Sequence, residues 1–356
     1  MRIGILTFHR AHNYGAMLQT YGLLNFLKSM GHDVYVIDYC PVLFKKAYRR
    51  TIPAIPRNPL NILKVLVNEP FVHKCRVKRY DAFNEFMKSE FNLYPWKKGF
   101  DGREFDIIFI GSDQVWNKDC LGGFDEIYWG DGLKCKVASY AASLAWFRPS
   151  AQELTKVKNY LNNFHSISVR ENDAAEYLAS ITNKPIDVVC DPTLLLDAQD
   201  WERVSIPVDE DKKYVLCYDL VSNPQCQEFA GELARSKGLK LINIVGVVNK
   251  TSPVNSVKTA GPREFLSYFR NSEYVVTTSF HGTAFSLIFN KQFYALGISK
   301  FGGRIQSLLR TMGLEKRMQI PDDLHNLEMC DFADVNKKLQ QLVLSSKQYI
   351  SRTISE

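Results

Sequence analysis

The chain has 356 residues and a net charge of +7, and 46% of its residues are hydrophobic while 23% are charged. This composition excludes a disordered chain, and the length favours two domains over a single small one. No apolar run approaches the roughly 18 residues of a membrane-spanning helix, and the eight cysteines are scattered singly without metal-binding spacing, so we expect a cytoplasmic globular protein with no structural metal.

Short apolar segments alternate with helical patterns in the first half of the chain. Strands are expected over 3–8, 34–37, 106–110, 137–141, 167–169 and 186–189. Helices are expected over 16–30, which Gly31 ends, and over 172–179. Short buried strands separated by helices are typical of a parallel sheet.

The same alternation restarts at Lys213. Strands are expected over 214–218, 241–245, 274–277 and 292–296, and helices over 224–237, 262–270 and 283–289. The pattern therefore predicts two α/β sheets, joined near residues 197–211. Such sheets bind ligands at the carboxyl ends of their strands, so the residues just after each strand are the candidate site.

Positive charge is concentrated between Pro41 and Tyr80, where ten lysines and arginines stand against one acidic residue. A cluster of one sign attracts an anionic partner such as a membrane surface or an acidic glycan. A solvated insertion is the alternative interpretation. Nucleic acid is disfavoured because no recognisable binding motif accompanies the cluster.

Two polar segments follow strands in the first half. Residues 9–15 run into a helix whose free N–H groups suit an anion or a hydroxylated ligand, although Asn13 could simply cap that helix. Residues 111–117 contain Asp113, a candidate base, and Trp116, whose ring could stack on a sugar. The alternatives are that Asp113 caps a helix and that Trp116 belongs to the core. The first segment lacks Gly-x-Gly-x-x-Gly, which argues against a dinucleotide site.

Two further segments carry titratable or charged side chains at strand ends. Arg170 ends an apolar strand, where a guanidinium can hold a carboxylate or phosphate in bidentate fashion. The alternative is a salt bridge with Glu171 or Asp173. His281 lies between a strand and a helix, where an imidazole among hydroxyl side chains could act on an anion bound at the helix N-terminus.

Several short motifs occur together and in order along nearly the whole chain. They are Gly4-Ile5-Leu6-Thr7-Phe8 with Asn13-Tyr14-Gly15, Gly111-Ser112-Asp113-Gln114-Val115-Trp116-Asn117, Ser168-Val169-Arg170-Glu171, Asp191-Pro192-Thr193-Leu194-Leu195 and Ser279-Phe280-His281-Gly282. Each motif alone is weak, but in this combination the chain resembles the polysaccharide pyruvyl transferase family.

The resemblance implies a glycosyltransferase-B-like α/β fold, with two Rossmann-like domains facing a cleft. The first covers 1–205 and includes the basic insertion 41–80, and the second covers 206–356 with a terminal helix. The implied reaction moves the enolpyruvyl unit of phosphoenolpyruvate to a sugar of a surface-polysaccharide precursor as a pyruvate ketal, without a cofactor. A lipid-linked acceptor at the inner face of the membrane would give the basic segment a purpose.

The resemblance also implies roles for two residues. It implies that His281 protonates the methylene carbon of the donor and that Arg170 binds the carboxylate or phosphate of the donor. From their own chemistry and positions, Asp113 is expected as the second catalytic residue, and Ser279, Gly282, Thr283 and Arg304 are expected as further donor-binding residues. The expected acceptor-binding residues are Asn13, Tyr14, Trp116 and Asn117. Phosphoenolpyruvate is a compact polyanion, so its site needs fixed cations and N–H donors.

One departure from the family pattern bears on these roles. Several members carry arginine and leucine before the motif histidine, where this chain has Ser279 and Phe280. Arg304, at the start of a predicted helix, is the candidate replacement, and Asp113 stands where members often have a glycine-rich run. Two alternatives therefore stay open: a glycosyltransferase that uses a nucleotide sugar, and a non-catalytic member that binds a glycan or an anion.

Overall fold

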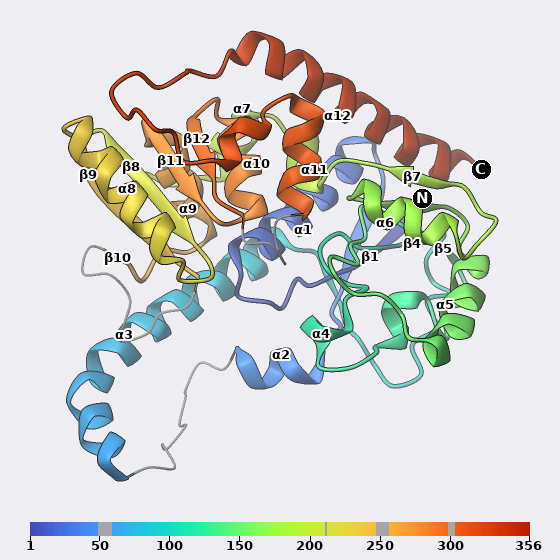
Figure 1. The fold of residues 1–356 in the computed structure, drawn as a ribbon. Helices are drawn as coiled ribbons and strands as arrows, with labels where there is room; N and C mark the ends of the chain where they lie inside the picture. The colour runs from blue at the N-terminus through green and yellow to red at the C-terminus, as the bar shows by residue number, and fades with distance from the viewer. Residues whose placement is uncertain (49–58, 211, 247–255, 298–302) are drawn as a thin grey trace.

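Two parallel sheets organise the chain (Figure 1). The computed structural model describes residues 1–48, 59–210, 212–246, 256–297 and 303–356. In the first sheet the strand order is β3-β2-β1-β4-β5. Its strands are β1 (Arg2–Leu6), β2 (Asp33–Ile37), β3 (Leu93–Tyr94), β4 (Ile107–Ile110) and β5 (Lys136–Ser139). This order is that of a Rossmann-like domain.

A small parallel pair continues the first domain beside β5. Its strands are β6 (Ile167–Val169) and β7 (Ile186–Val188), and a bridge between Ala138 and Ser166 joins the pair to β5. The helices of this half are α1 (Tyr14–Ser29), α2 (Val42–Ala47), α3 (Pro59–Glu90), α4 (Lys118–Leu121), α5 (Ala151–Asn163), α6 (Asn172–Ala179) and α7 (Ala198–Val204). The N-terminal part of α3 extends away from the rest of the chain (Figure 1).

The second sheet repeats the order of the first. Its order is β10-β9-β8-β11-β12, from β8 (Tyr214–Asp219), β9 (Lys240–Val245), β10 (Ser256–Val257), β11 (Tyr274–Thr277) and β12 (Gln292–Ala295). The helices are α8 (Pro224–Ser236), α9 (Pro262–Asn271), α10 (Phe280–Ile288), α11 (Gly303–Met312) and α12 (Phe332–Ser355). The prediction of an α/β protein with two Rossmann-like domains is confirmed.

The two domains are packed together through Tyr14 of α1. Its ring stacks on Phe265 of α9 with centroids 4.3 Å apart, and its hydroxyl donates to the Ala260 carbonyl at 2.8 Å. Arg79 of α3 also crosses between the domains, because its guanidinium donates to the carbonyls of Val245 at 2.7 Å and Gly246 at 2.9 Å. Arg79 is therefore buried and is not part of a solvated basic surface.

The terminal helix α12 lies across the first domain. The Tyr349 hydroxyl donates to the Ser139 carbonyl at 2.8 Å, and the backbone N–H of Cys190 donates to Ser346 Oγ at 2.8 Å. Both partners belong to the first sheet or to the segment after β7. The last helix thus fixes the first domain relative to the second, from which it comes in sequence.

The basic segment between Pro41 and Tyr80 forms α2 and much of α3, while its residues 49–58 lie outside the described chain. α2 exposes Val42 (67%) and Leu43 (39%) beside two lysines. Among the described residues, no helix is both long enough and apolar enough to cross a membrane.

Candidate functional site

The carboxyl ends of the two sheets face each other, and the predicted chemical residues gather where they meet. His281 from the second domain lies against Gly15 at the start of α1, so closely that a Cβ on Gly15 would stand 2.0 Å from His281 Nδ1. Arg170 follows β6, and its guanidinium lies over the Phe280 ring, 4.4 Å from the centroid. Segments from both domains therefore form one site.

Arg170 and Asp191 form a buried ion pair at the base of this site. Arg170 Nη1 is 2.5 Å from Asp191 Oδ2, and the side chains are 2% and 0% exposed. Burial opposes the charge of each, but Asp191 and two further carboxylates outweigh it and raise the pKa of Arg170. In the same way, His281 and Arg170 hold the pKa of Asp191 well below its usual range.

Asp191 is positioned by a turn that the sequence encodes locally. Its Oδ1 caps the short helix 192–195, accepting from Thr193 N–H at 3.0 Å and Thr193 Oγ1 at 2.8 Å. Its Oδ2 accepts from Ser112 Oγ at 3.1 Å as well as from Arg170. This carboxylate also faces His281, with 3.7 Å between Asp191 Oδ2 and His281 Nε2. Asp191 thus contacts both Arg170 and His281.

Asp113 lies between two arginines from different domains. Its Oδ1 is 3.8 Å from Arg170 Nη2 and 3.8 Å from Arg304 Nη1. Both distances are beyond hydrogen-bond range, so Asp113 leaves Nη2 of Arg170 without a hydrogen-bond partner. Burial and the Arg170 charge lower the pKa of Arg304, as expected for two cations held close together.

Several buried polar atoms at this site have no hydrogen-bond partner within the described chain. They are Nε and Nη2 of Arg170, Nε2 of His281, Oε2 of Glu171 and the hydroxyl of Tyr218 at the end of β8. Buried polar groups in proteins are normally satisfied, and leaving one unpaired is costly. Unpartnered polar groups that converge in one interdomain site indicate a polar ligand.

The other predicted donor residues begin α10, which starts at Phe280, three residues before its predicted start. Ser279 is the N-cap and accepts from the Gly282 N–H at 3.3 Å, while the Thr283 N–H donates to the Ser279 carbonyl at 3.0 Å. The prediction that the N–H groups of Gly282 and Thr283 face a ligand is therefore wrong, because both are engaged within the helix. The N–H groups at the open end belong to Phe280 and His281.

The predicted acceptor residues lie elsewhere and serve the fold. Trp116 is buried, stacks on Trp129 with centroids 4.8 Å apart and donates its indole N–H to the Tyr128 carbonyl. Tyr14 belongs to the domain interface. Asn13 and Asn117 cap α1 and α4, accepting backbone N–H groups at 2.9 and 3.1 Å. The core alternative is correct for Trp116, which is buried, and the capping alternative is correct for Asn13, whose Oδ1 accepts from the first turn of α1.

Sequence reasoning missed Asp191, Tyr218 and Phe280 as members of the site. Asp191 lies in a motif that the family resemblance includes, and its place at a strand end was the available signal. Tyr218 also lies near the end of a strand, but an aromatic residue at such a position is typical of the hydrophobic core. Among the described residues, no group of histidine, cysteine, aspartate or glutamate side chains could hold a metal ion.

The close contact at Gly15 predicts that Gly15→Ala will destabilise the protein by about 1–3 kcal/mol, because the new methyl group must displace the His281 ring. Urea denaturation measures the change. Gly231→Ala in α8 is the matched control, since the nearest atom to its Cβ would be 3.5 Å away, and alanine there is expected to be neutral or to stabilise by about 0.5–1 kcal/mol. Equal effects at both glycines would contradict the tight packing of His281.

A family model described as polysaccharide pyruvyl transferase matches residues 13–300. No curated protein matches significantly. Solved structures that resemble the chain include UDP-GlcNAc 2-epimerase from Methanocaldococcus jannaschii, at 11% identity over 97% of this chain and 100% of that one, with a TM-score of 0.45.

Two further solved structures give similar values. Arabidopsis thaliana UGT89C1 in complex with quercetin shows 10% identity over 99% of this chain and 91% of that one, with a TM-score of 0.43. Glycosyltransferase SsfS6 from Streptomyces sp. SF2575, in complex with thymidine diphosphate, shows 15% identity over 97% and 96%, with a TM-score of 0.40. At these identities the similarity concerns the fold alone and says nothing about the reaction.

Proposed function

The chain belongs to the polysaccharide pyruvyl transferase family, and from that premise we propose that it transfers the enolpyruvyl unit of phosphoenolpyruvate to a saccharide as a pyruvate ketal. The observation that carries the proposal is the convergence of unpartnered buried donors from Arg170 and His281 in one interdomain site. A compact polyanion satisfies such donors.

Donor binding rests on the two arginines. Arg170 Nε and Nη2 are buried without hydrogen-bond partners, and Arg304 faces the same carboxylate, Asp113. Guanidinium groups bind carboxylate and phosphate oxygens in bidentate geometry and stay charged at any relevant pH. Arg304 therefore supplies the second cation that Ser279 cannot, and it approaches from α11 instead of from the histidine motif.

Proton transfer is assigned to His281. Its Nε2 faces the site without a hydrogen-bond partner, and Asp191 at 3.7 Å stands ready to pair with a protonated ring. Protonating the methylene carbon of phosphoenolpyruvate leaves an oxocarbenium-like centre at the neighbouring carbon. A fixed acid at this position lowers the barrier for that step. Asp113, between the arginines, is proposed to accept a proton from the attacking hydroxyl.

The reaction balances with two hydroxyl groups of one sugar. Two carbon–oxygen bonds form at the central carbon of the donor, and its bond to the phosphate oxygen breaks. The enzyme gives one proton to the methylene carbon, which becomes a methyl group, and one hydroxyl proton of the sugar restores it. The other hydroxyl proton leaves with inorganic phosphate. His281 donates and Asp113 accepts, so neither residue needs a redox partner or a metal in this scheme.

We also propose that the acceptor is carried on a lipid at a membrane surface. The exposed Val42 and Leu43 beside the lysines of α2 support this, because apolar side chains flanked by cations favour an anionic bilayer surface. Co-sedimentation with vesicles of phosphatidylglycerol and phosphatidylcholine tests the contact. Failure to sediment even at low ionic strength would remove this part of the proposal.

Calorimetric titration tests the donor directly. Phosphoenolpyruvate is expected to bind the wild-type protein saturably, whereas uridine, guanosine and thymidine diphosphates are expected to give no saturable heat. Release of inorganic phosphate in the presence of a saccharide acceptor would then report turnover. Binding of a nucleotide diphosphate without binding of phosphoenolpyruvate would overturn the proposed donor and favour a nucleotide-sugar enzyme.

A further inference from the structure

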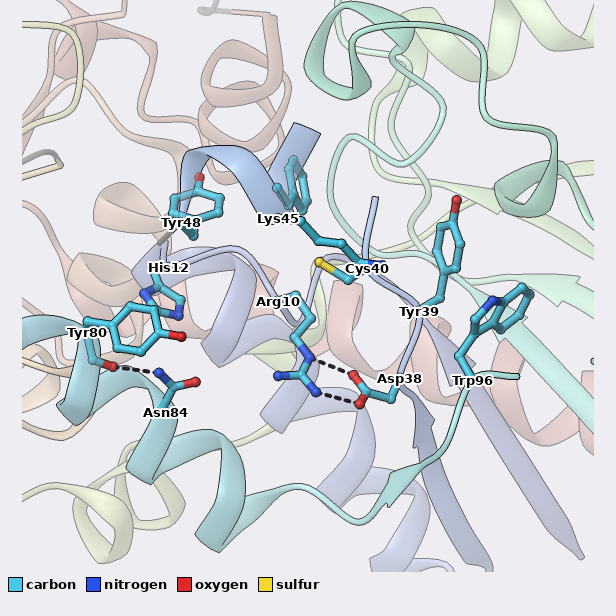
Figure 2. Close-up of a pocket in the computed structure, with 11 residues that line it drawn as sticks. Arg10, His12, Asp38, Tyr39, Cys40, Lys45, Tyr48, Tyr80, Asn84 and Trp96 are labelled. Atoms are coloured by element: carbon cyan, nitrogen blue, oxygen red, sulfur yellow. Dashed lines mark hydrogen bonds and ion pairs between the residues drawn. The ribbon is translucent and has the colours of Figure 1, made fainter. Parts of the chain in front are cut away.

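A second hollow lies beside the candidate site, in the first domain. It is a pocket of about 580 Å³ at the carboxyl ends of β1 and β2, between α2 and α3 (Figure 2). Its lining includes Arg10, Asp38, Tyr39, Tyr48, Tyr80 and Trp96. The volume falls within the range of small-molecule sites, and the mixture of rings with a few polar groups is typical of them.

A charged pair provides hydrogen-bonding groups between the rings. Arg10 Nε and Nη2 donate to the two carboxylate oxygens of Asp38 at 2.6 and 2.5 Å (Figure 2). His9, buried behind the pair, is 3.0 Å from Asp38 Oδ1. Although burial opposes its charge, hydrogen bonds from His9 and Arg10 lower the pKa of Asp38 to about 2. The pair is partly exposed, so it offers N–H donors and a carboxylate acceptor to the pocket.

Aromatic rings stand on both sides of this pair. Tyr39 and Trp96 meet edge to face on one side, with centroids 4.8 Å apart. On the other side His12 lies 4.6 Å from the Tyr80 ring and stacks on Tyr48 at 5.5 Å (Figure 2). Burial lowers the pKa of His12 to about 4, so at neutral pH its ring has one donor and one acceptor nitrogen.

The pocket and the candidate site share the segment that follows β1. His12 lines the pocket and precedes by three positions the glycine against which His281 packs. Burial and, after it, the Asp113 charge raise the pKa of the Tyr48 hydroxyl, which also lines the pocket. A ligand that extends from the pocket along this segment runs toward His281.

We propose that this pocket binds the sugar unit that precedes the reacting sugar of an oligosaccharide acceptor. The inference rests on the proposed function, because that function defines which sugar unit of the acceptor reacts. Pyranose rings present apolar C–H faces to aromatic side chains, and vicinal hydroxyls match a carboxylate beside a guanidinium. A free phosphate is a poorer occupant, because Arg10 is already neutralised by Asp38. The acceptor is thus at least a disaccharide.

Saturation-transfer NMR with disaccharides tests the pocket without any turnover. The probes are maltose, cellobiose, lactose and N,N′-diacetylchitobiose, each compared with its monosaccharides. We expect at least one disaccharide to bind and to lose affinity about tenfold in Tyr80→Ala and in Trp96→Ala, the size of one lost ring contact. Tyr80→Phe, which keeps the ring, is expected to bind within about twofold of wild type.

Tyr160→Ala is the matched control, because Tyr160 is a partly exposed helical tyrosine on α5, outside the pocket. Unchanged disaccharide binding in Tyr80→Ala and Trp96→Ala, or no saturation transfer from any probe to the wild type, would overturn the inference. Phosphoenolpyruvate titrations of the same samples separate the two proposals. Disaccharide binding without phosphoenolpyruvate binding would overturn the proposed function and leave the saccharide pocket standing.

Discussion

Replacing His281 with glutamine is expected to lower kcat for ketal formation by about a thousandfold, while the Kd for phosphoenolpyruvate changes by less than about threefold. Glutamine retains a polar group near Asp191 but has no proton to transfer to carbon. In the proposed function the donor binds through Arg170 and Arg304, which this change leaves in place beside Asp113. Phosphate release gives kcat, and calorimetry gives the Kd.

His165→Gln is the matched control for this change. His165 is also partly buried and has an unpartnered Nε2, but it follows α5 and lies at the opposite end of β6 from Arg170. Its replacement is expected to leave both kcat and donor binding unchanged. A kcat for His281→Gln within about tenfold of wild type would remove the histidine from the proton-transfer role.

The sheets were predictable because their signals are local. The bounds of α6, β6 and β11 agree with the hydrophobic pattern to the residue, since short buried strands and the helices between them are encoded by neighbouring side chains. The hydrophobic pattern predicts the start of α10 three residues late, because Phe280 and His281 resemble a strand-end loop. Ser279, a common N-cap residue type, marks the observed start.

The positions of Arg170 and His281 in the site were predictable from one topological rule. Residues that follow parallel strands lie at the same edge of a sheet, and both residues follow such strands. Trp116 and Tyr14 were wrong as acceptor residues because their burial depends on Trp129 and Phe265, which come from distant parts of the sequence. An aromatic residue beside polar ones looks the same in sequence whether it faces sugar or core.

The pocket beside Arg10 and Asp38 was not predictable from the sequence for the same reason. Its aromatic rings come from α3 and from the segments that follow β2, α2 and β3, so no motif links them. The basic segment was read as a charge pattern, yet Tyr48 and Tyr80 within it line the pocket, and Arg79 joins the domains. Contacts with distant parts of the chain determine where these side chains lie, and the composition of the segment does not reveal such contacts.

Replacing Arg170 with glutamine is expected to weaken phosphoenolpyruvate binding by about a hundredfold or more. The change removes the unpartnered Nε and Nη2 donors. It also leaves the Asp191 carboxylate facing the incoming anion without its cation. Calorimetric titration measures the effect, and Arg148→Gln is the control, because Arg148 pairs with Asp173 at the surface. Equal Kd values for Arg170→Gln and wild type would exclude Arg170 from the donor site.

Combining Arg170→Gln with Asp191→Asn distinguishes the effect of Arg170 on donor binding from its effect on the stability of the fold. Arg170→Gln is expected to destabilise the fold by about 3 kcal/mol, because a buried carboxylate loses its partner. Adding Asp191→Asn removes that charge and is expected to recover most of the lost stability in urea denaturation. Donor binding is not expected to return, since the amide replaces a charge and not the guanidinium. Recovery of phosphoenolpyruvate binding in the double variant would mean that Arg170 acts only by neutralising Asp191, and that the donor is held by Arg304 alone.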